Sequence, residues 1–380
     1  MVIKLGTNVL CRENGEPALA RLYAIVEDVV DAHRAGKEII LVSSGAISLG
    51  MHRLGLQERP ETLEAKQACA AIGQIRLMGV YEQAFERFGI SAAQVLLSES
   101  DFSGRERYLN LRNTLQKLLQ LRCIPIVNEN DTVSTLEIET HVSSGEDHSV
   151  VFGDNDMLSA LVASKLGAHL LVILSDVEGL YDQDPSTSDD AKLIGCVNSV
   201  TPEIEALAQG RSSRGRGGMR TKIQAAKVAS HSGTTTIIAR GSQSKVIRKV
   251  LSGDEVGTCF MPQKALSSRK RWIAFATAVS GRVQVNAGAR SALVTRRASL
   301  LFAGVTALEN DFKSGDIVSI VDDAGYELAR GITNYSSAEA QKLVGRQSAE
   351  IQKGTSDKRR PEEFIHRDNI VVVTSEASDP

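Results

Sequence analysis

Short apolar runs alternate with amphipathic helical patterns from the first residue to about residue 260 of this 380-residue chain. The runs of strand length include Val2–Leu5, Glu38–Val42 and Ile124–Val127, and apolar residues recur at helical spacing between them. Strands that alternate with helices are joined by right-handed crossovers, so the strands run parallel and helices cover both faces. The pattern predicts an α/β fold with a mainly parallel sheet sandwiched by helices.

The alternation of strand-like and helical patterns stops after Pro262. Residues 269–335 contain short strand-like pieces separated by glycines, which is typical of a small β-rich domain. These pieces are WIAFA, RVQV, SALV, DIVSIV and ELARGI. We therefore expect two domains, residues 1–262 and residues 269–373, joined by a linker at 263–268.

Charge and cysteine usage narrow the class of protein. The formal net charge is −2, so composition indicates neither a nucleic-acid-binding protein nor one that binds anionic membranes. The 5 cysteines are scattered without a CxxC pair, which favours reduced thiols over a disulfide framework or a zinc site. The sequence contains neither a secretory signal nor an apolar run of ~18 residues, and we expect a cytoplasmic protein without a membrane segment.

Polar segments follow the predicted strands at the point where each strand ends. Ligands of open parallel sheets bind beyond the carboxyl ends of the strands. The needs of a turn would explain one such loop, but a series of them at one edge favours a catalytic face. The segments are Gly6–Asn8, Ser43–Ala46, Asn128–Asp131, Ser175–Asp176 and Arg240–Ser242.

Two lysine-bearing segments are candidates for phosphate binding. Lys4 stands near the end of the first strand, before Gly6, so its ammonium and nearby N–H groups can surround phosphate oxygens; a surface lysine before a tight turn is the alternative. Lys222 lies in the first turn of a predicted helix, behind the glycine-rich segment 215–218. A cation there opposes the helix dipole unless an anion binds, which favours function. No Walker A motif or protein-kinase motif set occurs, so phosphoryl transfer would use other devices.

Three further segments suit an amino acid or a cation. Ser44 and Gly45 open a helix that can hold a carboxylate or a phosphate, with a simple N-cap as the alternative. Asn128–Asp131 suits an ammonium group, with an Asx turn as the alternative. The run Gly153–Asp156 holds more polar residues than one N-cap requires, and an Asp there can orient two lysines or bind Mg²⁺ through water.

Several segments stand in a recognisable order and spacing along the chain. They are VIKLGTNVL (2–10), LVSSGAISLG (41–50), IPIVNENDTV (124–133), FGDNDMLSA (152–160), LSDVEGLYDQDP (174–185) and RGGMRTKIQAA (216–226). Together they resemble the amino-acid kinase superfamily and, within it, the glutamate 5-kinase family, whose C-terminal PUA domain is resembled by KRWIAFA (270–276) and FIHRDNIV (364–371). The resemblance implies ATP-dependent phosphorylation of the L-glutamate side-chain carboxylate to L-glutamyl 5-phosphate, the first step of proline biosynthesis.

The resemblance also assigns roles to individual residues. Lys4 and Lys222 would stabilise the transferring phosphoryl group, and Asp156 would organise the two lysines. The implied glutamate-binding residues are Ser44, Gly45, Asn128, Asp131 and Asn155. The implied ATP-binding residues are Lys4, Gly6, Thr7, Ser175, Asp176, Arg216, Gly217, Gly218, Met219, Arg220, Thr221 and Lys222. Mg²⁺ would accompany ATP, the chain itself would hold no dedicated metal site, and a homodimer or homotetramer is expected.

Some features depart from the family pattern or allow another function. The segment 134–151 is longer than in the family, where this neighbourhood is implicated in inhibition by proline, so proline is a candidate inhibitor. Arg216 and Arg220 stand where small or hydroxylated residues are expected. The alternatives are a kinase of the same superfamily acting on aspartate, N-acetylglutamate, carbamate or UMP, and an RNA-binding protein. The few basic clusters make RNA binding the less favoured of these.

Overall fold

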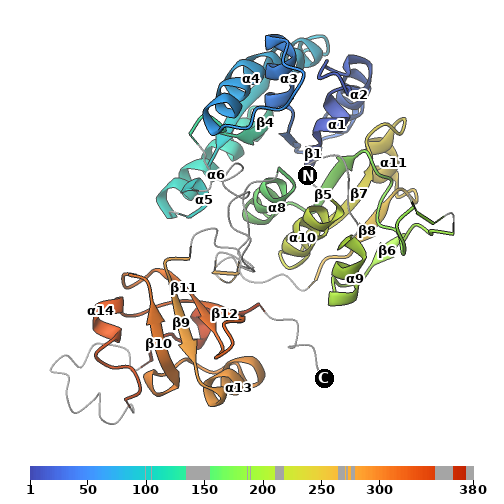
Figure 1. Ribbon diagram of the computed structural model, residues 1–380. Helices are drawn as coiled ribbons and strands as arrows, with labels where there is room; N and C mark the ends of the chain where they lie inside the picture. The colour runs from blue at the N-terminus through green and yellow to red at the C-terminus, as the bar shows by residue number, and fades with distance from the viewer. Residues whose placement is uncertain are drawn as a thin grey trace. The chain divides into compact units, whose positions relative to one another are not determined.

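The computed structural model shows two compact units, with the division after residue 265 (Figure 1). The residues that it describes are 1–98, 100–103, 105–133, 155–185, 187–188, 190–209, 218–263, 270, 273–274, 279–346 and 363–373. Within these ranges no helix combines the length and the apolar character that a membrane span requires.

An eight-stranded sheet forms the centre of the first unit, in the order β3-β4-β2-β1-β5-β7-β8-β6. Its strands are β1 (Val2–Leu5), β2 (Ile40–Ser43), β3 (Ala92–Leu97), β4 (Ile124–Glu129), β5 (Leu170–Ser175), β6 (Cys196–Val197), β7 (Thr235–Arg240) and β8 (Thr258–Phe260). Strands β7 and β8 pair antiparallel, and the other neighbouring pairs are parallel. The predicted mainly parallel sheet is confirmed.

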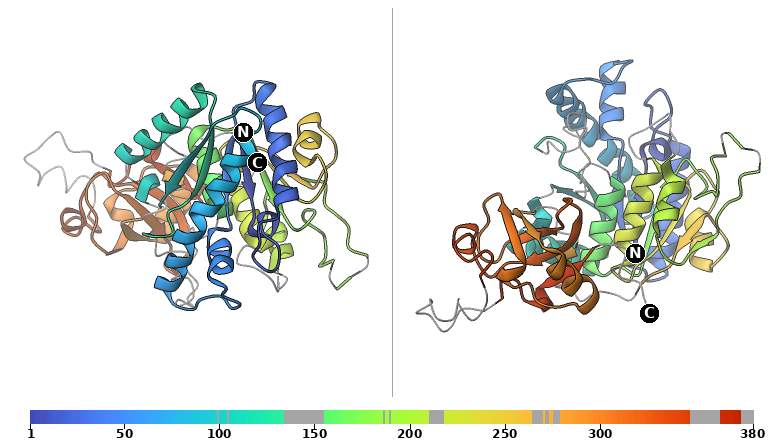
Figure 2. Two further views of the ribbon diagram at one scale, coloured as in Figure 1. Left: turned by 90° about the horizontal axis from the view of Figure 1, so that it is seen from above. Right: turned by 60° about the horizontal axis from the view of Figure 1, so that its bottom comes forward.

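Helices cover both faces of this sheet (Figure 2). They are α1 (Thr7–Leu10), α2 (Leu19–Arg34), α3 (Ala46–Leu54), α4 (Leu63–Glu86), α5 (Ser100–Ser103), α6 (Arg105–Gln120), α8 (Asn155–Leu166), α9 (Pro202–Ala206), α10 (Met219–Ser230) and α11 (Val246–Ser252). Helices α2, α4 and α11 share one aliphatic core with the sheet. On the other face, α8 packs on β1, β2, β4 and β5, and α10 packs on α8 and β7.

Strand β1 lies between β2 and β5, near the middle of the sheet. Successive side chains of a strand point to opposite faces. Ile3 and Leu5 belong to the core that the sheet shares with α2, so Val2 and Lys4 point to the face that carries α8. The alternation along one short strand thus places a lysine in the interior of the unit, beneath α8.

Helices α3 and α4 approach each other at two glycines. A Cβ added to Gly73 would lie 1.7 Å from the carbonyl oxygen of Ala46, and one added to Gly50 would lie 1.8 Å from that of Cys69. The two backbones therefore touch, and this contact fixes Ala46, the first residue of α3. The preceding Gly45 has φ +94°, a left-handed conformation that glycine adopts without strain.

The second unit is a five-stranded sheet in the order β10-β9-β11-β12-β13. Its strands and helices are β9 (Gly281–Val285), α13 (Ala287–Arg296), β10 (Val305–Glu309), β11 (Ile317–Val321), β12 (Glu327–Ile332), α14 (Ser337–Ala340) and β13 (Ile370–Val372). In its core the ring of Phe302 contacts those of Tyr335 and Phe364. The predicted β-rich character of this part is confirmed.

Two of the strand-like pieces expected here are not strands. SALV (291–294) lies inside α13, because the side chain of Asn286 accepts a hydrogen bond from the backbone N–H of Ala289 (2.9 Å) and starts a helix there. Of WIAFA, the described residues Ile273 and Ala274 are helical. A short apolar run is compatible with either a strand or a helix turn. For SALV, the N-cap at Asn286 favours the helix.

The contact between α3 and α4 leads to a prediction on stability. Gly73→Ala should lower the free energy of unfolding by about 1–3 kcal/mol or more, because the methyl group meets backbone that cannot rotate away. Gly79→Ala in the same helix is the matched control, since its added Cβ meets nothing within 4 Å. It should stabilise by about 0.5–1 kcal/mol. Urea unfolding of both variants measures the difference, and equal effects would contradict the contact.

Candidate active site

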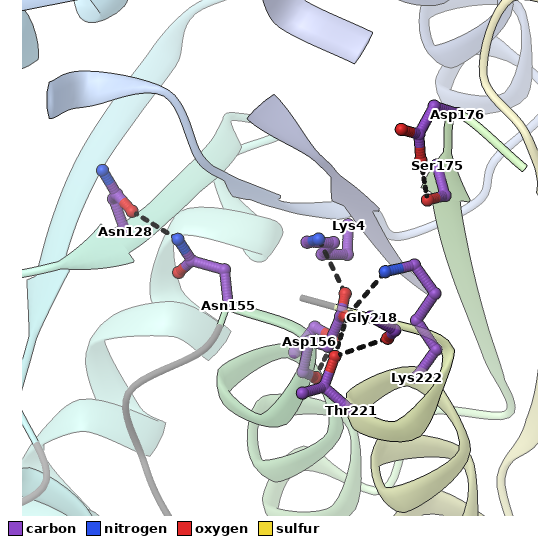
Figure 3. Close-up of polar contacts among 10 residues, drawn as sticks. Lys4, Asn128, Asn155, Asp156, Ser175, Asp176, Gly218, Thr221 and Lys222 are labelled. Atoms are coloured by element: carbon purple, nitrogen blue, oxygen red, sulfur yellow. Dashed lines mark hydrogen bonds and ion pairs between the residues drawn. The ribbon is translucent and has the colours of Figure 1, made fainter. Parts of the chain in front are cut away.

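Lys4, Asp156 and Lys222 meet in the interior of the first unit, as Figure 3 shows. The Nζ of Lys4 lies 2.6 Å from one carboxylate oxygen of Asp156, and the Nζ of Lys222 lies 3.2 Å from the other. The Asp156 side chain is 0% exposed, and those of the lysines are 6% and 5% exposed. The structure thus brings together the three predicted catalytic residues, from β1, α8 and α10.

The first turns of α8 and α10 supply further contacts to this trio. The hydroxyl of Thr221 lies 2.9 Å from Oδ2 of Asp156 and 3.0 Å from the carbonyl oxygen of Gly218. The hydroxyl of Ser159 donates to the backbone carbonyl of Asp156 (2.6 Å). Asp156 lies at the N-terminal end of α8, where a negative charge is favoured by the helix dipole. Local helix structure therefore holds the carboxylate in place before any ligand binds.

Electrostatics keep the Asp156 carboxyl ionised. Burial alone would raise its pKa, but the charges of Lys4 and Lys222 outweigh burial and lower the pKa to about 2. With both lysines protonated, the trio carries more positive than negative charge in a site shielded from water. Such a site attracts an anion and cannot use Asp156 as a base near neutral pH.

A second group of polar side chains lies at the carboxyl end of β5. Asn8 Nδ2 donates to Oδ2 of Asp176 (2.7 Å), and Ser175 Oγ donates to Oδ1 (2.9 Å). Burial raises the pKa of Asp176, but these two hydrogen bonds, a backbone hydrogen bond and the charge of Lys222 together outweigh burial and lower the pKa. Asp176 is therefore a fixed acceptor on the opposite side of Lys222 from Asn155 in Figure 3.

A chain of three amides lies at the ends of β4 and α8. The backbone N–H of Glu129 donates to Oδ1 of Asn128 (2.9 Å), which marks that atom as the acceptor. Asn128 Nδ2 therefore donates to Oε1 of Gln74 (2.9 Å), and Asn155 Nδ2 donates to Oδ1 of Asn128 (3.3 Å).

The direction of this amide chain leaves one donor and one acceptor at its ends. Gln74 Nε2 and Asn155 Oδ1 are both buried, and neither has a hydrogen-bond partner among the residues that the structure describes. A buried polar atom without a partner costs about 1–3 kcal/mol, so such atoms point to a ligand. An N–H donor and an oxygen acceptor at opposite ends complement a carboxylate and an ammonium group.

The remaining predicted residues are distributed around these groups. Ser44 is buried after β2, and its backbone N–H donates to the carbonyl of Leu5 (3.2 Å). The N–H of Gly6 donates to Leu174 (3.1 Å), and a Cβ on Gly6 would lie 3.5 Å from Lys4 Nζ. Thr7 begins α1, Asp131 follows β4, Met219 begins α10 and Arg220 is exposed in the first turn of α10. The described residues do not include Arg216, Gly217 or any residue of the segment 134–151.

Three residues of the site were not predicted from the sequence. Asn8 and Ser159 bond to predicted residues, and Gln74 comes from the middle of α4. Asn8 stands in a predicted polar loop, which is a usable signal. Gln74 is separated from Asn128 by a crossover of the chain, and only the packing of α4 reveals it.

The donor set bears on whether a divalent metal fits here. Among the described residues, no three His, Cys, Asp or Glu side chains cluster so as to hold an ion. Asp156 is engaged by two lysines, and among the described residues Asp176 is a candidate carboxylate for such an ion. Mg²⁺ is commonly held by one or two carboxylates together with substrate phosphates. The residues therefore fit an ion that arrives with a nucleotide.

Comparisons with known proteins identify the family of this chain. The family model described as "Amino acid kinase family" matches residues 1–240, and that of the "PUA domain" matches residues 281–355. Glutamate 5-kinase of Moorella thermoacetica is 48% identical over 375 residues, covering 98% of this chain and 96% of that one. Glutamate 5-kinase of Myxococcus xanthus is 44% identical, with 98% and 96% covered. The chain belongs to the amino acid kinase family and, within it, to the glutamate 5-kinases.

Two solved structures match part of this chain. UMP kinase from Bacillus anthracis has a TM-score of 0.46 and 16% identity, covering 70% of this chain and 96% of that one. Carbamate kinase from Giardia lamblia has a TM-score of 0.47 and 18% identity, covering 69% and 98%.

The buried Asp156 leads to a prediction on pH. A carboxyl with a lowered pKa stabilises the fold above its ordinary value of 3.8, and that contribution is lost as pH falls through about 2. Asp156→Asn should cost about 3–5 kcal/mol at neutral pH, because two lysines lose their partner. The difference in free energy of unfolding between Asp156→Asn and wild type should become smaller below pH 3.8, as measured by urea unfolding.

Asp31→Asn is the control for this experiment. Asp31 pairs with Arg248 at the surface, where both side chains are exposed, so its removal should cost no more than about 1 kcal/mol. If the loss in free energy of unfolding caused by Asp156→Asn stays constant down to pH 2, the ion-pair assignment is contradicted.

Proposed function

We propose that the chain transfers the γ-phosphoryl group of ATP to the side-chain carboxylate of L-glutamate. The products are ADP and L-glutamyl 5-phosphate, which begins proline biosynthesis. The observation that carries the proposal is the buried trio of Lys4, Asp156 and Lys222, whose excess positive charge suits a phosphoryl group between two anions. Support comes also from relatives named glutamate 5-kinase that span nearly the whole chain.

The proposed chemistry needs alignment and charge neutralisation rather than a base. A glutamate side chain has a pKa near ~4.3 and is already a nucleophilic carboxylate at neutral pH. Lys4 and Lys222 would stabilise the negative charge spread over the transferring group. Asp156 would act by holding the two ammonium groups at fixed positions, since its own oxygens are occupied by them and by Thr221.

The amide chain supplies a proposed site for the amino-acid end of the substrate. The free Nε2 of Gln74 would donate to the α-carboxylate, and Oδ1 of Asn155 would accept from the α-ammonium group. Asn128 would hold both amides in the orientation that this requires. Ser44, Gly45 and Asp131 are the other proposed glutamate contacts, on the predictions from the sequence.

The nucleotide is proposed to bind on the other side of the trio. The proposed contacts are Gly6, Thr7, Ser175, Asp176 and the run from Arg216 to Lys222. The first N–H groups of a helix have no partner within it, so the start of α10 suits phosphate. Mg²⁺ is the proposed divalent ion, and it would neutralise charge on the ATP phosphates.

Four finer statements accompany the proposal. Residues 1–262 and 269–373 are the proposed domains, the second being PUA-like. A homodimer or homotetramer is proposed, and the 77% exposure of the apolar Ile75 on α4 is compatible with a covered surface there. Inhibition by proline and a cytoplasmic location stay predictions from the sequence.

Acyl-phosphate trapping tests the proposed reaction. The chain should consume ATP when Mg²⁺ and L-glutamate are present, and hydroxylamine should convert the product to γ-glutamyl hydroxamate. Aspartate, N-acetylglutamate, carbamate and UMP serve as alternative acceptors. Product from one of these, with none from glutamate, would refute the proposed substrate while keeping a kinase.

The lysines are tested in the same assay. Lys222→Ala and Lys4→Ala should each lower kcat by about 10²–10³-fold, because each removes one positive group from the transition state. Lys227→Ala in the same helix as Lys222 is the matched control, since Lys227 pairs with Glu205 near the surface. A kcat close to wild type in both Lys222→Ala and Lys4→Ala would remove the catalytic assignment.

Gln74 is tested by Gln74→Glu. This variant keeps an oxygen to accept from Asn128 but loses the free donor at the end of the amide chain. The KM for glutamate should rise roughly 10- to 100-fold, the cost of losing a hydrogen bond to a charged group, while the KM for ATP stays unchanged. Gln83→Glu, on the exposed side of α4, is the control. An unchanged KM for glutamate would exclude Gln74 from substrate binding.

A further inference from the structure

Three sulfur-containing side chains gather at the edge of the main sheet that is formed by β6 and β8. Cys196 lies in β6, Cys259 lies in β8, and Met261 follows β8 directly. None of them takes part in the proposed kinase chemistry. Cys196 and Met261 are exposed, Met261 by 41%, and Cys259 is partly buried.

The register of the two strands sets the two thiols side by side. Cys196 and Cys259 are paired residues of parallel strands, so their side chains project from the same face of the sheet, about 4.8 Å apart at the backbone. Met261 stands two residues after Cys259 and therefore shares its face, while the intervening Phe260 is buried on the other face. The Sγ of Cys259 lies 4.0 Å from the Sδ of Met261.

The spacing of these sulfurs suits a shared metal ion. Two sulfur ligands about 2.3 Å from one ion, at a trigonal angle of about 120°, lie about 4.0 Å apart. The observed separation of Cys259 and Met261 has that value. Cys196 is exposed, so the face that the sulfurs share is open to an incoming ion.

The chemistry of the three ligands selects the ion. Thiolate and thioether sulfur are soft donors and favour Cu(I), whereas a closed Zn²⁺ site uses four ligands from Cys, His and carboxylates. Among the described residues no three His, Cys, Asp or Glu side chains are grouped so as to hold a metal ion, and the third candidate ligand beside the two thiols is the Met261 thioether.

We propose that Cys196, Cys259 and Met261 form a binding site for one Cu(I) ion at the edge of the sheet. Binding replaces the two thiol protons, which pass to solvent, by one Cu⁺ ion held by two thiolates and one thioether. No electron is transferred. The site does not depend on the proposed kinase function, and its failure would leave that function untouched.

Competition for Cu(I) tests the proposal. The reduced full-length protein is titrated under argon with Cu(I) in the presence of bicinchoninate, whose Cu(I) complex is coloured. Wild type should withdraw one Cu(I) per chain from the coloured complex. Cys196→Ser and Cys259→Ser should weaken this binding by at least about 100-fold, and Met261→Leu by about 10-fold, which are the bounds known for supporting residues of metal sites.

Controls separate this result from other causes. Cys123→Ser removes a thiol elsewhere on the unit and should bind Cu(I) like wild type, and circular dichroism should show all variants folded. Equal Cu(I) binding by wild type and Cys196→Ser would overturn the site. Tighter binding of Zn²⁺ than of Cu(I), no effect of Met261→Leu, or loss of two thiols to a disulfide without bound copper would each overturn it as well.

Discussion

The candidate site depends on burying one carboxylate between two ammonium groups. Each of these ions costs several kcal/mol to remove from water, and attraction repays the cost only when the geometry is good and the remaining hydrogen bonds are made. Here both oxygens of Asp156 are used, by Lys4, Lys222 and Thr221. Replacing the trio with apolar residues could give an equally stable core. The trio keeps an excess of positive charge in the interior, and the proposed binding of a phosphoryl group would use that charge.

The surrounding elements supply the positions of these three groups. Strand β1 is hydrogen-bonded on both sides over its whole length, which leaves Lys4 little freedom. Helices α8 and α10 pack on each other, so Asp156 and Lys222 are set by one helix pair. The backbone contact of α3 with α4 fixes the loop after β2 in a similar manner. Rigid elements, rather than loops, therefore carry the charged part of the site.

Much of this could be predicted from the sequence, for a physical reason. Strand Val2–Leu5 was predicted with the bounds that the structure shows, because an apolar run before a glycine turn has few alternatives. Lys222 could be chosen because a cation in the first turn of a helix opposes the helix dipole, and Asp156 because its polar run exceeds the needs of one N-cap. Lys4 alone could equally be a surface lysine, and the family resemblance assigned its role. Gln74 gave no such conflict, since a glutamine in a helix is ordinary until packing buries it. The strand predicted at SALV was wrong, because the N-cap that starts a helix there lies five residues earlier, at Asn286.

The order of the strands explains why the two halves of the site face each other. Chain order runs outward from β1 in both directions, with β2 and β4 on one side and β5 and β7 on the other. Such a reversal opens a crevice at the carboxyl ends of the strands. The amide chain of Asn128 and Asn155 belongs to the first side, and Ser175 and Asp176 belong to the second. Lys4 stands on β1, at the boundary itself. On the proposed assignment of the two ligands to the two sides, the transferred phosphoryl group would pass this lysine, so the topology of the sheet would also set the path of the phosphoryl group.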